Sequence, residues 1–303
     1  MLSLVNSTLQ EVSIKHDIGQ GAIEGILGRH AQATVDWDKI KSMEVVGVDG
    51  IALKKGHRDF VAIASACVQG KLMVPGILPD RTEATVKAFF LGIPKRLRKT
   101  VRAVCSDLYK GFINAAKEVF GKRVAVCADR FHVAKLYREG LDSLRKKEMR
   151  RLKKELPEAE YKSLEKVLWL VRRPFDELTS DEQHTLNRLF RFSPKIRQAY
   201  ELCGSLTAIY NSPLSKGHGK RKMKGWMRRA ANSGLTCFNR FLKTLETNME
   251  EITNYFIDRN SSGFVEGLNN RIKVLKRRCY GISNCGRLFQ RLCLDLQGYA
   301  MFL

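Results

Sequence analysis

The stretch MEVVGVDGIAL, residues 43–53, decides the fold. It is apolar and rich in β-branched side chains, a composition typical of a buried strand. A basic turn at residues 54–58 leads into a second apolar segment, 59–68, and Gln69-Gly70 leads into a third, 71–78. Three strand patterns joined by short turns predict an antiparallel meander.

Downstream of this meander, helix and strand patterns alternate. A helix pattern opens at residues 81–83, and the apolar strand VRAVCSD follows at 101–107. A second helix is expected over 109–120, ended by Gly121, before the strand RVAVCAD at 123–129. The crossover between the first and fourth strands favours a parallel, right-handed pair. The order β-β-β-α-β-α-β predicts an α/β fold with a ribonuclease-H-like core, although other α/β folds begin similarly.

The character of the sequence changes after Phe131. The following residues are basic and helix-forming, with breaks at Pro157 and Pro174, and they predict an all-helical insertion. The chain then returns to the core with one helix from near Asn260 to Arg278 and another from Asn284 to Ala300. The predicted organisation is a helical segment at 1–40, the first part of the core at 41–133, a basic helical insertion at 134–258 and the end of the core at 259–303.

The amino-terminal segment predicts two short helices. Asp17 is expected to cap a helix through Ala22 and Leu27, and Gly28 to end it. A second helix is expected from His30 to Trp37. Helix, glycine turn and helix outline a DNA-reading helix-turn-helix, and they fit a plain helical hairpin equally well.

Composition narrows the class of protein. The 303 residues include 54 Lys and Arg against 31 Asp and Glu, a formal net charge of +23. Such clustered charge points to a polyanionic partner, the alternative being a soluble basic protein without one. The eight cysteines form no C-x-x-C pair, which argues against a zinc ribbon. The start is not typical of a signal peptide, and no window approaches the roughly 18 apolar residues of a membrane helix, so a cytoplasmic protein is expected.

Two aspartates stand at the ends of strand patterns. Asp49 follows Val45–Val48, and Asp107 follows residues 101–106. Neighbouring parallel strands lie about 4.8 Å apart, so two carboxylates at matching positions can share a metal ion. Mg²⁺, with Mn²⁺ as a substitute, suits such oxygen ligands beside a phosphate. Alternatively, each aspartate caps a loop or helix, as Asp107 would before the next helix.

A third carboxylate lies in the segment 262–282. Its apolar residues recur at spacings of three and four, which predicts a helix with a buried face. Glu266 shares the polar face with amides and basic side chains, an arrangement suited to a metal next to a phosphate backbone; the alternative is a solvated helix face. The members of this polar face are Glu266, Asn269, Asn270, Lys273 and Arg277.

Three basic clusters are candidates for DNA contact. The first, Arg145–Lys154, fits a solvated helix face equally well, and the third, Lys273–Arg278, follows Glu266. The middle cluster contains glycines and one tryptophan, and it predicts a flexible arm whose cations bind phosphates while the indole stacks on a base. Its candidate residues are Lys216, Lys220, Arg221, Lys222, Lys224, Trp226, Arg228 and Arg229.

Four motifs resemble the bacterial insertion-sequence transposases of the ISL-three type, members of the DDE group. They are VVGVDGIALKKGHRDFVAIA (45–64), VCSDLYKGF (104–112), ADRFHVAK (128–135) and VEGLNNRIKVLKRRCYGI (265–282). The resemblance extends over residues 43–303, and the last motif is the most specific. It implies metal-dependent DNA cleavage and strand transfer at the ends of an insertion sequence, by an oligomer bound to double-stranded DNA in the bacterial nucleoid.

The same resemblance implies roles for individual residues. Asp49, Asp107 and Glu266 match the catalytic, metal-binding carboxylates of the family. Asp129 and His132 match an Asp-x-x-His pattern near the active site of related transposases, where the histidine either orients DNA or a catalytic group or is structural. Asn269 and Asn270 are expected beside the metal ligands.

The chain departs from the family pattern at its start, where relatives carry a cysteine-rich zinc-binding segment. This departure predicts a truncated or split copy. Two alternatives to the transposase therefore stay open, a truncated DNA-binding relative without activity and a ribonuclease-H-like nuclease that cuts without joining.

Overall fold

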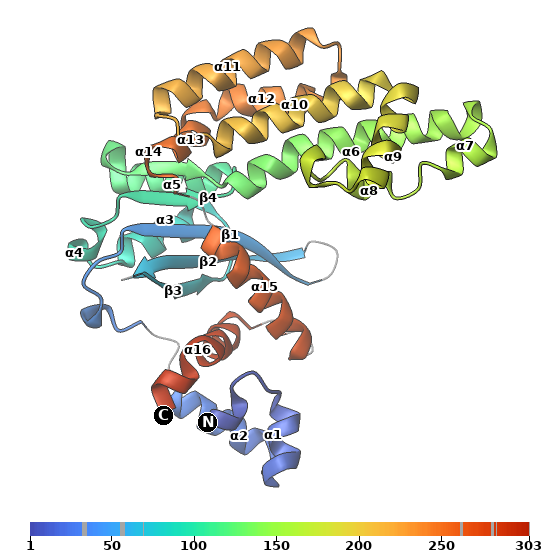
Figure 1. The fold of residues 1–303 in the computed structure, drawn as a ribbon. Helices are drawn as coiled ribbons and strands as arrows, with labels where there is room; N and C mark the ends of the chain where they lie inside the picture. Colours follow the sequence, from blue (N-terminus) through green and yellow to red (C-terminus); the bar gives the residue numbers. More distant parts are fainter. Residues whose placement is uncertain are drawn as a thin grey trace. The chain divides into compact units, whose positions relative to one another are not determined.

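The computed structural model divides the chain into two compact units (Figure 1). The first combines Met1–Asp129 with Asn260–Leu303, and the second is Arg130–Arg259. The residues that the structure describes are 1–31, 35–54, 58–68, 70–260, 263–279, 282 and 284–302.

A mixed five-stranded sheet forms the centre of the first unit, in the spatial order β3-β2-β1-β4-β5. The antiparallel meander predicted from the sequence is confirmed, and so is the parallel pairing of the first and fourth strands. The turn residues 55–57 and Gln69 lie outside the described residues. The strands are β1 (Val45–Lys54), β2 (Arg58–Val68), β3 (Lys71–Leu78), β4 (Ala103–Ser106) and β5 (Ala125–Ala128).

One face of this sheet packs against α3 (Glu83–Gly92) and α5 (Lys110–Phe120). Val46 and Val48 of β1 belong to this core, in which the rings of Phe90 and Phe120 meet edge to face at 5.2 Å. Thr82 caps α3 through its hydroxyl, and Gly121 ends α5 with a positive φ of 66°. The short α4 (Lys95–Arg98) and η3 (Gly121–Arg123) complete the connections.

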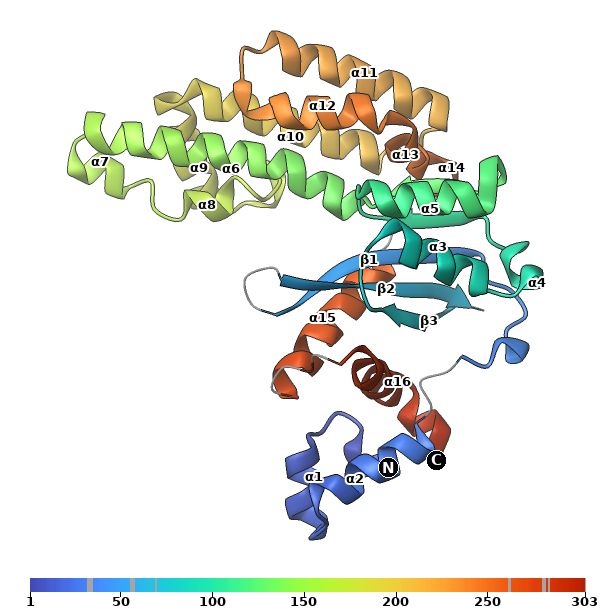
Figure 2. The ribbon, with the colours of Figure 1, turned by 180° about the vertical axis from the view of Figure 1, so that it is seen from behind.

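The opposite face is covered by α15 (Gly263–Arg278) and α16 (Cys285–Phe302), as Figures 1 and 2 show from two sides. The helix pattern of the sequence accounts for this packing. Leu268, Ile272 and Leu275 of α15 are buried against Ile51 and Ile63 of the sheet. Because strand side chains alternate between faces, β1 presents residues of even number to α3 and α5 and residues of odd number to α15.

The amino-terminal helix predicted through Ala22 and Leu27 is confirmed, and a helix that the sequence analysis did not predict precedes it. The two helices are α1 (Leu9–His16) and α2 (Gln20–His30), preceded by η1 (Leu2–Leu4) and followed by η2 (Trp37–Lys39). Asp17 is not the cap of the second helix but ends the first in a left-handed conformation, with φ of 51°.

Two other expectations for this segment are also wrong. Gly28 continues α2, because a single glycine costs a helix only about 1 kcal/mol. The predicted helix from His30 to Trp37 is absent at its described positions, since His30 ends α2; residues 32–34 lie outside the described range.

The second unit is a bundle of helices around an aromatic core. Trp226 lies at its centre, with its ring 5.8 Å from Phe238 and 5.6 Å from Phe241. The helices are α6 (Arg130–Glu155), α7 (Glu158–Lys162), α8 (Val167–Leu170), η4 (Phe175–Glu177), α9 (Ser180–Phe192), α10 (Pro194–Asn211), α11 (Lys216–Asn232), η5 (Thr236–Phe238), α12 (Asn239–Thr247), α13 (Met249–Thr253) and α14 (Tyr255–Asp258).

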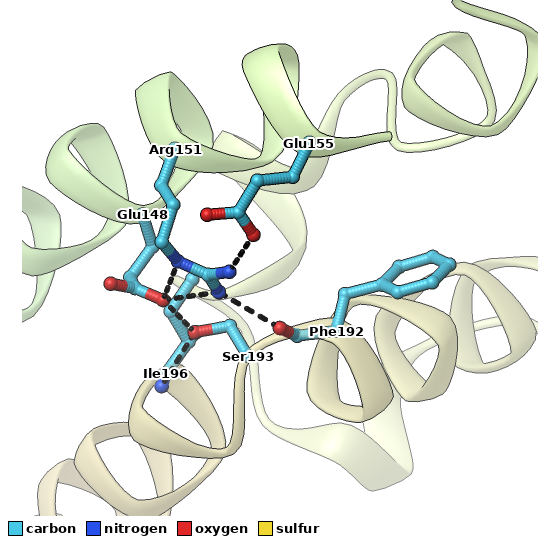
Figure 3. Close-up of polar contacts among 6 residues, drawn as sticks. All are labelled: Glu148, Arg151, Glu155, Phe192, Ser193 and Ile196. Atoms are coloured by element: carbon cyan, nitrogen blue, oxygen red, sulfur yellow. Dashed lines mark hydrogen bonds and ion pairs between the residues drawn. The ribbon is translucent and has the colours of Figure 1, made fainter. Parts of the chain in front are cut away.

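A buried carboxylate joins three of these helices (Figure 3). Glu148 of α6, 5% exposed, accepts hydrogen bonds from Ser193 Oγ at 2.7 Å and from Arg151 Nη2 at 2.8 Å. Arg151 also donates to the carbonyl of Phe192, at the end of α9, at 2.9 Å. Burial opposes the charge on Glu148, but the hydrogen bonds from Arg151 and Ser193 outweigh it and lower the pKa of this carboxyl.

Among the described residues, no helix combines the length and the apolar composition that crossing a bilayer requires.

Candidate active site

The register of the parallel strands aligns three aspartates. Val48 of β1 pairs with Ser106 of β4, and Ser106 pairs with Ala128 of β5. The next residue of each strand is an aspartate, so Asp49, Asp107 and Asp129 occupy neighbouring positions of one row. The amide of Asp129 donates to the carbonyl of Ser106 at 2.7 Å, which continues the parallel pairing into this row. The aspartates therefore follow one another at the spacing of adjacent strands, about 4.8 Å.

The row belongs to the sheet face that α15 covers. Asp49 is two residues before Ile51, which packs against α15, and strand residues two apart share a face. Cys105 and Cys127, two residues before Asp107 and Asp129, pack together. A hydrogen bond with Cys127, burial and the neighbouring charge of Asp129 raise the pKa of the Cys105 thiol. This thiol stays protonated near neutral pH, so it is no candidate nucleophile.

The aspartates are well positioned by their surroundings. Asp49 is 7% exposed and Asp129 5%, whereas Asp107 is half-buried. One oxygen of Asp49 accepts from the amide of Gly50 at 2.8 Å, and one oxygen of Asp107 accepts from the amide of Tyr109 at 2.9 Å. The loop contact that the alternative interpretation predicted for Asp107 is thus present at one carboxylate oxygen.

The third predicted carboxylate lies on α15, near its start. The helix runs alongside β1 (Figures 1 and 2), and Lys276 donates to the carbonyl of Ala52 at 2.6 Å. The backbone of Glu266 belongs to this helix, but the side chains of Glu266 and Asn269 lie outside the described part. Asn270, Lys273 and Arg277 are exposed. Within the described residues, no three Asp, Glu, His or Cys side chains form a complete metal site.

The structure adds Arg81 to this region, a residue that the sequence analysis did not select. Its guanidinium lies 4.0 Å from the ring centroid of Phe60 and 5.0 Å from that of Tyr109. Gly50 follows Asp49 and has no side chain; a Cβ placed there would lie 4.0 Å from Cδ of Arg81. A cation is thus held by aromatic faces on the side of the even-numbered residues of β1, opposite to the side of Asp49. The sequence signal was weak, because Arg81 and Phe60 are 21 residues apart and meet only in the folded sheet.

Comparison with known proteins decides the family. Residues 46–292 match the family of ISL3-type DDE transposases. The chain belongs to this family. It is 26% identical to the transposase for insertion sequence element IS1001 of Bordetella parapertussis, across 98% of this chain and 72% of that protein. It is 21% identical to the transposase for IS1557 of Mycobacterium tuberculosis, across 86% of this chain and 62% of that protein. The family resemblance inferred from the four motifs is confirmed.

The Asp-x-x-His motif of this transposase spans the junction of the two units. Asp129 is the last residue of the first unit, and His132 lies in the first turn of α6. The His132 ring is 5.9 Å from Phe131, edge to face. Next to them, Arg130 donates to the hydroxyl of Tyr255 at 3.1 Å, which fixes the start of α6 within the second unit.

The middle basic cluster of the transposase is not a flexible arm. It forms α11, whose first turn is capped by Ser215 and whose apolar side is buried. Lys216 and Lys220 are half-buried and both pair with Glu250. The remaining cations of the cluster stay on the exposed side of the helix, namely Arg221, Lys222, Lys224, Arg228 and Arg229.

Trp226 is the clearest departure from the sequence analysis. Its side chain is fully buried, and its indole N–H donates to the carbonyl of Leu202 at 2.8 Å. The expected stacking on a DNA base is therefore wrong in this structure. Positions 219, 223, 226 and 230 of α11 are all buried, so the tryptophan falls on the helix face that packs into the bundle.

Proposed function

We propose that the chain is a DDE transposase that cleaves DNA at the ends of an insertion sequence and joins the freed ends to target DNA. The observation that carries the proposal is the row formed by Asp49 and Asp107, on the sheet face that the Glu266 helix covers. We assign the sheet unit as a ribonuclease-H-like core and the unit of residues 130–259 as a helical insertion into it. The predicted boundaries, 41–133, 134–258 and 259–303, stay part of this proposal.

Asp49, Asp107 and Glu266 are proposed to hold Mg²⁺, or Mn²⁺ in its place. The donor set fits, because Asp49 and Asp107 occupy neighbouring positions of one row and hard divalent ions prefer carboxylate oxygens. When bound, such ions stabilise charge on the attacking and leaving oxygens of an in-line phosphoryl transfer. Asp129, His132, Asn269 and Asn270 are proposed to orient these ligands.

The proposed reaction has two steps. Water attacks a phosphodiester at the element end, so that one P–O bond forms, the bond to the 3′ oxygen breaks and a 3′ hydroxyl leaves with a proton. That hydroxyl then attacks a phosphodiester of target DNA and displaces another 3′ oxygen.

The DNA is proposed to be bound by cations of both units. On α11 these are the exposed Arg221, Lys222, Lys224, Arg228 and Arg229, and on α15 Lys273 and Arg277. Each phosphate that a cation contacts releases counterions, which favours binding at low salt. Joining two element ends requires two active sites, so we propose an oligomer on DNA, acting in the bacterial nucleoid.

Cleavage of a labelled duplex that carries the terminal repeat of the element tests this proposal. We expect cutting that requires Mg²⁺ or Mn²⁺ and is lost in Asp107→Asn, together with strand-transfer products on a target plasmid. Arg188→Gln, at an exposed position of α9 in the second unit, is the control for a change of charge outside the sheet unit. Shortened DNA without joined product would instead indicate a nuclease. Binding without cutting under either metal would indicate a DNA-binding relative without activity.

A further inference from the structure

A cleft lined by polar and apolar side chains lies in the first unit, on the far side of α15 and α16 from the sheet. It has a volume of about 580 Å³ and is bounded by α1 and α2 together with the end of α15 and the start of α16. Thr8, Gln10 and Glu24 line it from the amino-terminal helices, and Arg278, Arg287 and Arg291 from the carboxy-terminal ones. Three guanidinium groups thus meet in one cleft that the proposed active site does not use.

Two of these arginines have carboxylate partners. Arg287 pairs with Glu24 through two contacts, at 3.0 and 3.2 Å. Arg278 pairs with Asp295 through Nη2, while its Nε finds no hydrogen-bond partner within the described part of the chain. Asp295 also accepts from the amide of Asn6 at 2.9 Å. These pairs neutralise the charges of Arg278 and Arg287, but they leave Nε of Arg278 without an acceptor among the described residues.

Arg291 is different. It is 3% exposed, and its Nη2 donates to the carbonyl of Ser7. Its Nε and Nη1 are buried and have no hydrogen-bond partner among the residues that the structure describes. A desolvated cation with unsatisfied donors is costly, and native structures rarely keep one unless an ion or ligand completes it. Arginine is the side chain best suited to a phosphate, because its donors are planar and always charged.

We propose that this cleft binds a backbone phosphate of DNA, with Arg291 as the principal donor and Arg278 as the second. The choice of a DNA phosphate as the anion rests on the proposed function. An enzyme that acts on DNA and has a net charge of +23 attracts the phosphodiester backbone of its substrate. The cleft is a second contact point, separate from the aspartate row. It ties DNA binding to the packing of α1 and α2 on α16, because Arg291 also holds the carbonyl of Ser7.

Binding of a labelled duplex to the full chain, with EDTA present to prevent cutting, tests the cleft. Gln10→Glu places a carboxylate among the cleft arginines without removing any of them. We expect the dissociation constant to rise about tenfold. The slope of log K against log salt should fall by about 1 as one phosphate contact is lost. Gln297→Glu is the matched control, because Gln297 is exposed on the same α16 and does not line the cleft.

Arg291→Gln should weaken binding by a similar factor. If that variant fails to fold, Gln10→Glu decides the question, since Gln10 is exposed on α1. Equal affinities of Gln10→Glu and Gln297→Glu would overturn the proposal. A second outcome would also overturn it. If inorganic phosphate raised the melting temperature of the wild type but not that of Gln10→Glu, and both proteins bound the duplex equally well, the cleft would be a site for free phosphate and not for DNA. This assay measures binding and needs no cutting. A protein that does not cleave DNA would contradict the proposed function, but the cleft could still be tested.

Discussion

The two units bury carboxylates in opposite ways. In the helical unit, Glu148 is surrounded by donors, with Arg151 and Ser193 within 2.8 Å. In the sheet unit, Asp49 and Asp129 are as deeply buried as Glu148, but their strand neighbours place one aspartate beside the next. Glu148 meets a cation of its own chain, whereas each aspartate of the row has another aspartate at the matching position of the neighbouring strand.

This difference separates a carboxylate that is paired with an arginine from the carboxylates that we propose as metal ligands. A buried acid paired with an arginine is satisfied, and removing one partner destabilises the protein. Acids placed side by side raise each other's free energy, and a divalent cation relieves the repulsion. Substitutions in the two places should therefore have opposite consequences for activity and for stability.

The largest effect is expected at the aspartate row. Asp49→Asn should lower the rate of metal-dependent DNA cleavage by about a thousandfold, equivalent to about 4 kcal/mol of transition-state stabilisation. The free energy of unfolding should stay within about 1 kcal/mol of the wild type, because Asn keeps the oxygen that accepts from Gly50 and removes a like charge. Cleavage assays and denaturant titrations of the same preparation measure both quantities.

Mg²⁺ gives the control for this comparison. It should raise the melting temperature of the wild type and leave that of Asp49→Asn unchanged, because an ion stabilises only the state that binds it. A variant that unfolds and loses cleavage in parallel would contradict the assignment, since Asp49 would then be a structural residue like Glu148.

A smaller effect, of opposite kind, is expected at Glu148. Glu148→Gln should lower the free energy of unfolding by about 1–3 kcal/mol, because Arg151 and Ser193 lose a charged acceptor. The loss stays below that of a fully buried pair, since the Arg151 side chain is 38% exposed and can reach water.

The cleavage rate per folded molecule should not change in Glu148→Gln. Glu155→Gln is the matched control, because Glu155 also pairs with Arg151 but is half exposed, and it should change stability by less than about 0.5 kcal/mol. A loss of cleavage in folded Glu148→Gln would contradict the comparison, because Glu148 would then be needed for activity in the same way as the aspartates of the row.

The sequence predicted the sheet better than the helical unit, for a physical reason. Strand side chains alternate with a period of two, so the apolar runs around Asp49 and Asp107 fix both the strands and the row at their ends. Amphipathic helices fix only which face is buried. The glycines around Trp226 suggested an arm, but burial at positions 219, 223, 226 and 230 places the tryptophan in the core.

Contacts between distant residues were beyond the reach of the sequence. Arg81 acquires its place only when β2 brings Phe60 beside it, and Glu148 meets Ser193 across 45 residues. Arg291 resembles any helix-surface arginine in sequence, yet it is buried with unsatisfied donors. Local patterns predict elements and their exposed faces, whereas the partners of a buried charge depend on the tertiary fold.

The smallest predicted effect is the pH dependence that Glu148 contributes. Burial opposes its charge, but the hydrogen bonds from Arg151 and Ser193 prevail and lower its pKa in the folded chain. A lowered folded pKa means that the stabilisation is complete above the unfolded value, about 4.3, and is lost as the pH falls through the folded value. Denaturation from pH 7 down to pH 3 should therefore show wild type and Glu148→Gln converging below about pH 4. A stability difference independent of pH would mean that Glu148 acts through its shape and hydrogen bonds rather than its charge.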